Sequence, residues 1–187
     1  MKAGVRALGI AESYRGSTST LAGAVVRASR VADGFVFGRC TVGGSDATAA
    51  VVDMVERLDR DDVRYLLLSG IALAWFNVVD LRRLHEETGL PVVSVTYEAS
   101  PGLESAIREA FDDPDTVADR LATYDRQPAR RRLTVNDETV YVRSVGIEDE
   151  AANDVVRSFT PEGGRPEPLR VARLAASAAD DFDRSSI

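Results

Sequence analysis

The fold is decided by residues 63–95, which read VRYLLLSGIALAWFNVVDLRRLHEETGLPVVSV. Two continuous apolar runs, at 63–68 and 90–95, are typical of strands buried on both faces. Between them the sequence predicts a loop at 69–76 and a helix that starts at Asn77 and ends at Gly89. This order of strand, helix and strand favours parallel pairing with a right-handed crossover.

The residues before this unit predict an antiparallel opening and one further helix. Apolar runs at 5–10 and 20–28 are joined by a polar loop at 11–18, and a third strand is predicted at 35–42. Ser45 is placed to cap a helix whose apolar residues recur at i, i+4, i+7, i+8 and i+11. The parallel unit therefore extends a sheet that begins with antiparallel strands.

The residues after the unit predict a less regular second half. The predicted elements are helices at 103–111 and 116–124, an Arg-rich linker at 126–132, a hairpin with strands at 133–135 and 140–145, helices at 148–159 and 169–179, and a frayed tail at 180–187. Taken with the first half, they predict an α/β fold in which a mixed sheet is flanked by helices, in one domain that spans residues 1–187.

The composition predicts a cytoplasmic chain. An apolar content of 44% over 187 residues is enough for one well-buried core. No stretch approaches the roughly 18 to 20 apolar residues of a membrane helix, and the first residues lack the apolar core of a signal peptide. Cys40 is the only cysteine, so we expect it to be a small buried residue, without a disulfide or a cysteine-based zinc site. The composition does not indicate an oligomeric state.

The charge balance is strongly biased. Lys2 is the only lysine among 23 basic residues, which face 30 acidic ones, and the formal net charge is −7. Such an acidic, lysine-poor chain is typical of a cytosol at molar salt, where charges are screened over about 3 Å. Because binding through phosphates alone weakens steeply as salt rises, a nucleic-acid site in this chain must use metal, shape or base contacts.

Polar residues at the predicted strand ends are the candidates for chemistry, since open α/β sheets place ligand sites there. Glu12 follows the first strand, Asp46 lies in the first turn of the first helix, and Ser69 ends the first parallel strand. Converging carboxylates could hold Mg²⁺ or Mn²⁺ for metal-assisted phosphodiester hydrolysis. The alternatives are a hairpin-loop carboxylate for Glu12 and a helix-dipole contact for Asp46. The only histidine, His85, cannot anchor a metal site by itself.

Four residues around the predicted start of the second helix could contact a substrate. Trp75 and Phe76 could stack on a base, and core packing is the alternative. Asn77 and Asp80 are spaced as the cap and the third residue of a helix, and helix capping is the alternative that explains both.

Several arginines could hold phosphate. Arg170 and Arg173 lie about one turn apart on the last predicted helix, and a salt-bridged, solvated face is the alternative. The run at 130–132 consists of three arginines and could also touch nucleic acid, but in so acidic a chain pairing with carboxylates is the commoner role.

Five blocks of sequence carry a resemblance to a known family. They are LGI at 8–10, VGGSDAT at 42–48, FNVVDL at 76–81, TGLP at 88–91 and RPEPLRVA at 165–172. In order and spacing they resemble the archaeal endonuclease V-like family, also called domain of unknown function 99, over about residues 6–178. The resemblance implies a ribonuclease H-like fold. Together with the acidic, lysine-poor composition, it implies a haloarchaeal member of the family. It also implies a superfamily that uses acidic residues and Mg²⁺ to cut strands near deaminated bases.

The chain departs from the family pattern at the residues that matter for metal. The family has Gly-Ile-Asp-Asp after the first strand, whereas residues 9–12 read GIAE, so Ala11 stands where the leading metal-binding aspartate is expected. Trp75 replaces a glycine, and Arg173 replaces a histidine. Side chains alternate along a strand, so Glu12 can substitute for the lost aspartate only if the strand has already ended.

Two hypotheses follow from the residues and the resemblance. The first is an endonuclease that depends on Mg²⁺ or Mn²⁺ and acts on DNA or RNA containing uracil or hypoxanthine. The second is a noncatalytic domain that binds nucleic acid or a protein partner and has lost the metal site. In the first, Glu12 and Asp46 would be catalytic and hold the metal, while Ser69, Trp75, Asn77, Asp80, Arg170 and Arg173 would bind the substrate.

Overall fold

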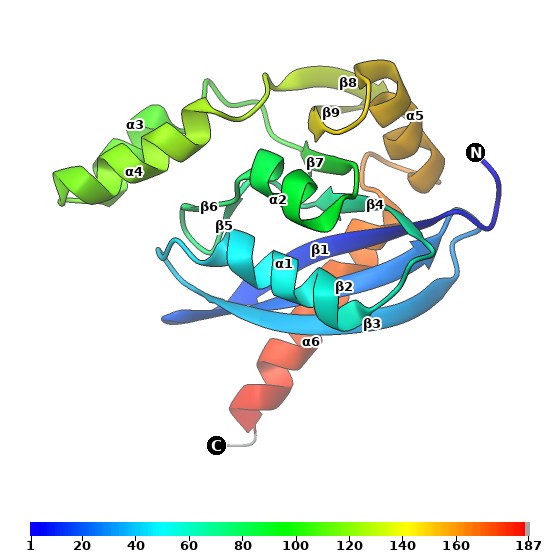
Figure 1. Ribbon diagram of the computed structural model, residues 1–187, viewed down its shortest axis with the longest axis horizontal. Coiled ribbons are helices and arrows are strands. Elements are labelled where there is room, and N and C mark those ends of the chain that lie inside the picture. The colour runs from blue at the N-terminus through cyan, green and yellow to red at the C-terminus, as the bar shows by residue number, and fades with distance from the viewer. Residues whose placement is uncertain (186–187) are drawn as a thin grey trace.

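The computed structural model describes residues 1–185, which form a seven-stranded sheet flanked by helices (Figure 1). The strand order is β3-β2-β1-β4-β7-β9-β8, and a separate two-stranded sheet pairs β5 with β6. The strands are β1 (Arg6–Tyr14), β2 (Thr18–Arg27), β3 (Ala32–Thr41), β4 (Val63–Leu68), β5 (Ala72–Leu73), β6 (Asn77–Val78), β7 (Val92–Thr96), β8 (Arg131–Val135) and β9 (Glu138–Val145).

The main sheet is mixed, as predicted. Strands β1, β2 and β3 are antiparallel, and β1, β4 and β7 are parallel to one another. The hairpin of β8 and β9 then adds to β7 in antiparallel fashion. Asn136 and Asp137, which join the hairpin strands, have positive φ angles of 48° and 67°, which two-residue hairpin turns require.

Six helices cover the sheet or extend beyond it. They are α1 (Ala47–Leu58), α2 (Leu81–Thr88), α3 (Glu104–Ala110), α4 (Pro114–Asp125), α5 (Asp149–Phe159) and α6 (Glu167–Ser185). Helices α1 and α2 lie on one face, and α6 crosses β1 and β2 on the other (Figure 1). Helices α3 and α4 pack on each other and project from the end of the sheet (Figure 1). Among the described residues, no helix is long and apolar enough to cross a membrane.

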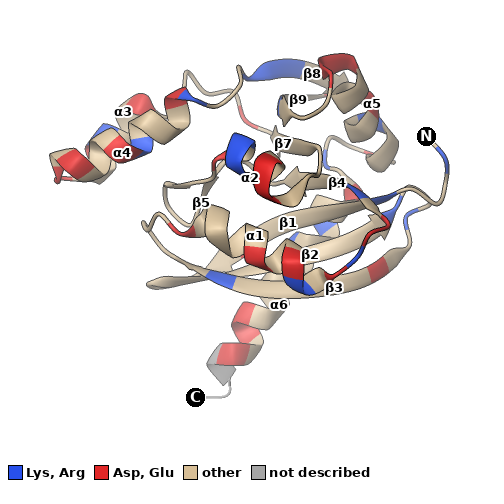
Figure 2. Ribbon diagram, in the orientation of Figure 1, with Lys and Arg blue, Asp and Glu red and all other residues tan. Residues whose placement is uncertain are grey.

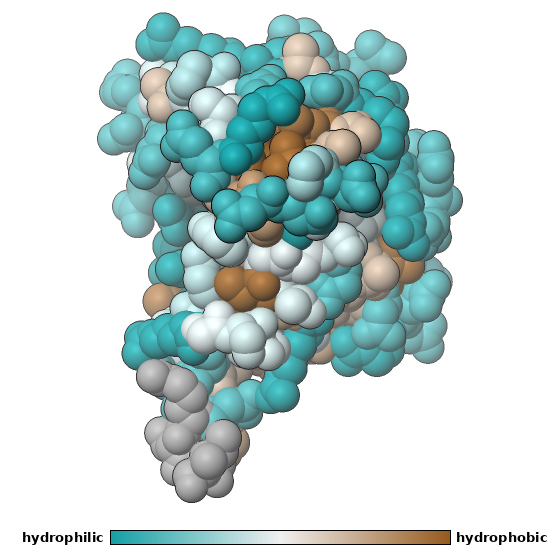
Figure 3. Space-filling view, turned by 90° about the vertical axis from the view of Figure 1, so that its left-hand side faces the viewer, coloured by the Kyte–Doolittle hydropathy of each residue, from teal (hydrophilic) through white to brown (hydrophobic). Residues whose placement is uncertain are grey.

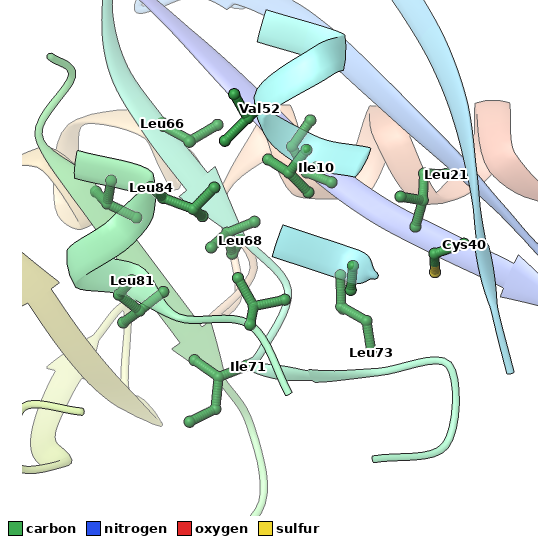
Figure 4. Packing of buried hydrophobic residues seen from close by; sticks show 14 of the residues in the cluster. Ile10, Leu21, Cys40, Val52, Leu66, Leu68, Ile71, Leu73, Leu81 and Leu84 are labelled. Carbon is green, nitrogen blue, oxygen red and sulfur yellow. The ribbon is translucent and has the colours of Figure 1, made fainter. Parts of the chain in front are cut away.

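The side chains of β1 alternate between these two faces. Leu8 and Ile10 join the core cluster beneath α1 and α2, and Figure 4 shows Ile10 among the side chains that pack there. Gly9 and Ala11 face α6 instead: a Cβ on Gly9 would collide with the backbone of Pro168, and Ala11 packs in a cluster with Ala172. The sheet therefore has an α1 face and an α6 face, and even-numbered residues of β1 belong to the α1 face.

The prediction that β1 ends at Ile10 was wrong. The strand continues to Tyr14, because residues 11–14 pair in register with residues 19–22 of β2. Backbone pairing overrides the polar character of this segment, which alone indicated a loop. Glu12 is therefore a strand residue, and it lies on the face opposite Ala11.

Two predicted helix starts were also displaced. Asp46, not Ser45, is the N-cap residue of α1, and its side chain makes no capping hydrogen bond. Helix α2 begins at Leu81, and Asn77 lies in strand β6. The capping residue of α2 is Asp80, whose side chain accepts hydrogen bonds from two backbone N–H groups of the first turn.

The predicted tail is helical as far as Ser185, because α6 continues through it. Asp180 is only 8% exposed, and the Ser13 hydroxyl donates a hydrogen bond to it at 3.4 Å, which ties this part of α6 to β1. The prediction of a frayed segment from 180 was therefore wrong for residues 180–185, while 186 and 187 lie outside the described residues.

Candidate functional site

The loop between β5 and β6 has an unusual backbone. Ala74, Trp75 and Phe76 have positive φ angles of 42°, 56° and 61° in succession. The left-handed region costs a residue with a side chain about 1–2 kcal/mol, so three such residues in a row need support from their surroundings. The loop lies between the ends of β1, β3 and β4, where the sequence predicted a site.

Glu12 supplies part of this support. Its Oε2 atom accepts hydrogen bonds from the backbone N–H of Ala74 and from the hydroxyl of Ser19, both at 2.7 Å. The carbonyl of Ala74 accepts a further hydrogen bond, from the N–H of Gly43 at 2.7 Å. Both backbone polar groups of Ala74 are thus paired with residues that are distant in sequence.

Asp46 is held by the end of β3 and by the loop. Its carboxylate accepts hydrogen bonds from the Thr41 N–H at 3.0 Å, the Thr41 hydroxyl at 2.8 Å and the Asn77 side-chain amide at 2.7 Å. Burial alone would raise the pKa of Asp46, but the hydrogen bonds from Thr41 and Asn77 outweigh it, so the pKa is lowered. The carboxylate stays ionised and bound to these donors.

Asn77 is the centre of this arrangement and is fully buried. Its side-chain N–H₂ group donates to Asp46 and, at 2.9 Å, to the carbonyl of Thr41. Its Oδ1 atom accepts the first N–H of α1, from Ala47, at 3.0 Å. Asn77, which lies in strand β6, therefore caps helix α1, and this explains why the Asp46 side chain need not do so. We call Glu12, Asp46, Asn77 and residues 74–76 the loop site.

The two carboxylates of the loop site lie at the same edge of the sheet. Cys40, which is buried, has its pKa raised to about 12, mainly by burial and then by the negative charges of Asp46 and Glu12. Both carboxylates are therefore near one thiol. Strand pairing of Cys40 with Ser19, which in turn binds Glu12, links them through one residue of β2.

The residues present do not fit a two-ion Mg²⁺ or Mn²⁺ centre. Within residues 1–185, no group of three or more His, Cys, Asp or Glu side chains is placed to hold a metal ion. Ala11 is 1% exposed, has no ligand atom and faces α6, whereas Glu12 faces α1. The oxygens of Asp46, and Oε2 of Glu12, already accept hydrogen bonds from the protein.

Trp75 is exposed at the tip of the loop. Its side chain is 47% exposed, and its ring lies 5.3 Å from that of Phe111 and 6.3 Å from that of Phe76. Arg120, which sequence reasoning missed, lies 4.0 Å from the centre of the Phe111 ring and donates hydrogen bonds to the carbonyls of Gly43, Gly44 and Phe76. The face that carries these loops is mostly hydrophilic, with small hydrophobic patches (Figure 3).

Asp80 and Arg170 are engaged in local interactions. Asp80 caps α2, accepts a hydrogen bond from the Gln127 side chain at 3.1 Å and pairs with Arg126. Arg170 pairs with Glu167 at 2.6 Å, one turn earlier on α6. Both residues therefore have the capping or ion-pair contacts that the alternative interpretations predicted.

Arg173 and Ser69 lie at the ends of β1 and β4. The exposed Arg173 donates from Nη1 to the backbone carbonyl of Glu12 at 2.7 Å, on the α6 side of β1. The backbone N–H of Ser69 donates to the carbonyl of Ile10 at 3.1 Å. Ser69 also lines a cavity of about 430 Å³ that lies between the ends of β4 and β7, the middle of β9 and helix α4. The structure thus brings Glu12, Asp46 and Asn77 together and places Ser69 in a separate cavity.

The fold is similar to that of endonuclease V. Human ENDOV has a TM-score of 0.63 at 14% identity, covering 96% of this chain and 85% of that one. An endonuclease V from Ciona intestinalis, in complex with a 24mer DNA containing an inosine followed by a ribo-adenosine, has a TM-score of 0.64 at 12% identity, covering 95% and 86%. The predicted ribonuclease H-like fold of endonuclease V is therefore confirmed.

The family is shown by sequence. The model of the endonuclease dU family matches residues 3–180, so this chain belongs to that family. The UPF0215 protein of Thermococcus kodakarensis is 38% identical over 160 residues, covering 84% of this chain and 80% of that protein. The UPF0215 protein of Methanopyrus kandleri is 34% identical over 191 residues, covering 100% and 96%. A protein of unknown function from Archaeoglobus fulgidus has a TM-score of 0.83 at 29% identity, covering 93% and 97%.

Proposed function

We propose that this chain binds nucleic acid at the strand ends and that Glu12 and Asp46 hold the binding loop in shape without serving as metal ligands. The observation that carries the proposal is the continuation of β1 to Tyr14, because it puts Glu12 on the face opposite Ala11. A family member that lacks the leading aspartate and cannot replace it from the next position has lost a ligand that two-ion cleavage needs.

The exposed groups of the strand ends support binding of a nucleic acid. Trp75 presents an aromatic ring on a loop whose backbone is fixed by Glu12 and Arg120, and a rigid ring loses little entropy when a base stacks on it. Arg173 presents a permanent positive charge beside the end of β1, where a phosphate could bind. Base stacking is also the kind of contact that survives high salt.

The proposal is tested by binding of single-stranded DNA and RNA, measured by fluorescence anisotropy in EDTA at low and at molar salt. We expect binding without divalent ions, and a Trp75→Ala variant should bind about tenfold more weakly, because one stacked base contributes about 1–3 kcal/mol. Phe35→Ala is the matched control, since Phe35 is 49% exposed on the edge strand β3. The absence of binding in EDTA, or equal losses in both variants, would contradict the proposal.

A second candidate is a divalent-metal-dependent endonuclease on nucleic acid that contains uracil or hypoxanthine. It is favoured by family membership and by the carboxylates of Glu12 and Asp46, whose negative charges both raise the pKa of the Cys40 thiol. Its test is strand cleavage of such DNA and RNA in high salt with Mg²⁺ or Mn²⁺. Asp53→Asn, at an exposed position of α1, is the control. If cleavage is lost in Asp46→Asn and kept in Asp53→Asn, the chain is a metal-dependent endonuclease.

A further inference from the structure

The cavity that Ser69 lines is surrounded by arginines without acidic partners. Arg130, Arg143 and Arg165 all line it, and in the described part of the chain none of them forms an ion pair with a carboxylate. The one acidic residue of the lining is Glu98, which is exposed and whose backbone carbonyl accepts a hydrogen bond from Arg130. Three unpaired cations around one cavity are unexpected in a chain of net charge −7.

Tyrosine rings hold these guanidinium groups in place without neutralising them. The Arg130 guanidinium lies 4.1 Å from the centre of the Tyr141 ring, and that of Arg165 lies 4.4 Å from the Tyr97 ring. Arg143 donates a hydrogen bond to the Tyr124 hydroxyl at 3.2 Å. Stacking on a ring orients a guanidinium without neutralising it. Arg130 and Arg143 also donate to the uncharged backbone carbonyls of Glu98 and Pro128, and the remaining N–H donors can face an anion. We call this site the arginine–tyrosine cavity; its defining residues are Tyr97, Tyr124, Arg130, Tyr141, Arg143 and Arg165.

Two buried side-chain polar atoms within residues 1–185 have no hydrogen-bond partner. They are Tyr97 Oη and Arg130 Nε. Both belong to residues that line the arginine–tyrosine cavity. Buried polar groups without partners are rare in folded proteins, and an unfilled ligand position is one of the few explanations.

The position of the cavity in the sheet also favours a ligand. It lies outside the carboxyl ends of the parallel strands β4 and β7, where open α/β sheets bind their ligands. Its volume of about 430 Å³ falls within the range of about 300–1,000 Å³ of small-molecule sites. Arg130, which lines it, begins the run of three arginines at 130–132. This basic run is visible as a blue segment at β8 in Figure 2.

We infer that the arginine–tyrosine cavity binds one phosphate-bearing nucleotide, with the arginines on the phosphate and the tyrosine rings against the base. Guanidinium groups are the preferred partners of phosphate because they can donate two parallel hydrogen bonds. The rings offer the flat surfaces on which a base stacks, whichever base it is. The inference rests on the proposed function, since it names what the strand ends bind. The nucleotide is either free or at a 5′-phosphorylated strand end.

The test is isothermal titration calorimetry with adenosine and uridine 5′-monophosphates, their nucleosides and inorganic phosphate. We expect the monophosphates to bind at least tenfold more tightly than the nucleosides or phosphate alone. Arg165→Gln and Arg130→Gln should each weaken that binding about tenfold. Arg132→Gln, in the same run of three arginines but outside the cavity lining, should leave it unchanged. Equal affinity for inorganic phosphate, or equal losses in all three variants, would overturn the inference.

A further variant separates loss of nucleotide binding from loss of folding. Tyr97→Phe keeps the ring and removes only the unpartnered hydroxyl, so the variant should fold and should bind the monophosphates several-fold more weakly. Unchanged binding in this variant would show that the hydroxyl does not face the ligand and would count against the inference.

Oligonucleotides with and without a 5′-phosphate separate the two sources of the nucleotide. A strand end is the source if the 5′-phosphorylated strand binds more tightly and loses this advantage in Arg165→Gln. A free nucleotide is the source if Arg165→Gln weakens binding of the monophosphates and leaves binding of the oligonucleotides unchanged. If unphosphorylated strands bind through Trp75 while no monophosphate binds at millimolar concentration, the inference fails and the proposed function stands.

Discussion

The strand ends carry two charged regions that differ in how their polar groups are satisfied. In the loop site, the side chains of Glu12, Asp46 and Asn77 all accept or donate hydrogen bonds within the protein. In the arginine–tyrosine cavity, Tyr97 Oη and Arg130 Nε are buried and have no hydrogen-bond partner within residues 1–185. The comparison shows that charged side chains can have all their hydrogen bonds satisfied within the protein, whereas a ligand site contains buried polar groups without a hydrogen-bond partner.

The largest expected effect tests whether the loop site is structural. Asn77→Ala removes the hydrogen bonds to Asp46, to the Thr41 carbonyl and from the first N–H of α1, so we expect the free energy of unfolding to fall by about 3 kcal/mol. Urea unfolding followed by circular dichroism measures it. Asn153→Ala, which removes one part-buried hydrogen bond from Arg131, is the control and should cost about 1 kcal/mol or less. If both variants lose the same amount, the loop site is not a structural unit.

A smaller effect is expected for Glu12. Glu12→Ala leaves the Ala74 N–H without its acceptor, and we expect a loss of about 2 kcal/mol together with faster amide hydrogen exchange at residues 74–76. A melting temperature that rises with millimolar Mg²⁺ or Mn²⁺ in the wild type, and not in Glu12→Ala, would instead identify Glu12 as a metal ligand.

Two tyrosines of the cavity should change stability in opposite directions. Tyr97→Phe removes an unpartnered hydroxyl, so the ligand-free protein should gain up to about 1 kcal/mol of unfolding free energy. Tyr124→Phe removes the acceptor of an Arg143 hydrogen bond and should lose about 1 kcal/mol. Thermal melts of both variants without nucleotide make the comparison. A loss in Tyr97→Phe would mean that its hydroxyl has a partner in the protein, and the contrast between the two regions would disappear.

The smallest expected effect is the pH dependence of the loop site. The pKa of Asp46 is lowered in the folded state, so its contribution to stability is present above the unfolded pKa, near about 3.9, and is lost as pH falls through the folded pKa. The stability difference between wild type and Asp46→Asn should therefore be constant near neutral pH and narrow below about pH 4. Urea midpoints across this range measure it, and a difference that stays constant would show that the charge of Asp46 is not used.

Much of the fold could be predicted because the signals are local. The buried runs that became β4 and β7, and the single apolar stripe of α1, follow from periodicity within one segment. The end of β1 could not be predicted in this way, because residues 11–14 are polar or small and become a strand only by pairing with β2. Asn77 was misplaced for a similar reason, since its spacing from Asp80 imitates a capping pair.

The candidate site was predicted only in part. Glu12, Asp46 and Asn77 were singled out and do lie together, but as hydrogen-bond partners of a strained loop. The arginine–tyrosine cavity was missed, because its residues are scattered over the loop after β7, helix α4, the approach to β8, strand β9 and the loop before α6. Arg165 lay within a block that resembles the family, and Arg130 lay in the arginine run; these were the signals that could have indicated it.

The sequence by itself determined the order of most elements, the family and the absence of a carboxylate at position 11, since each is written in adjacent or regularly spaced residues. Only the tertiary structure decided that Glu12 faces away from Ala11 and that three arginines converge without acidic partners. The physical reason is that strand pairing and side-chain convergence join residues far apart in the chain, and their energies depend on neighbours that no local pattern records.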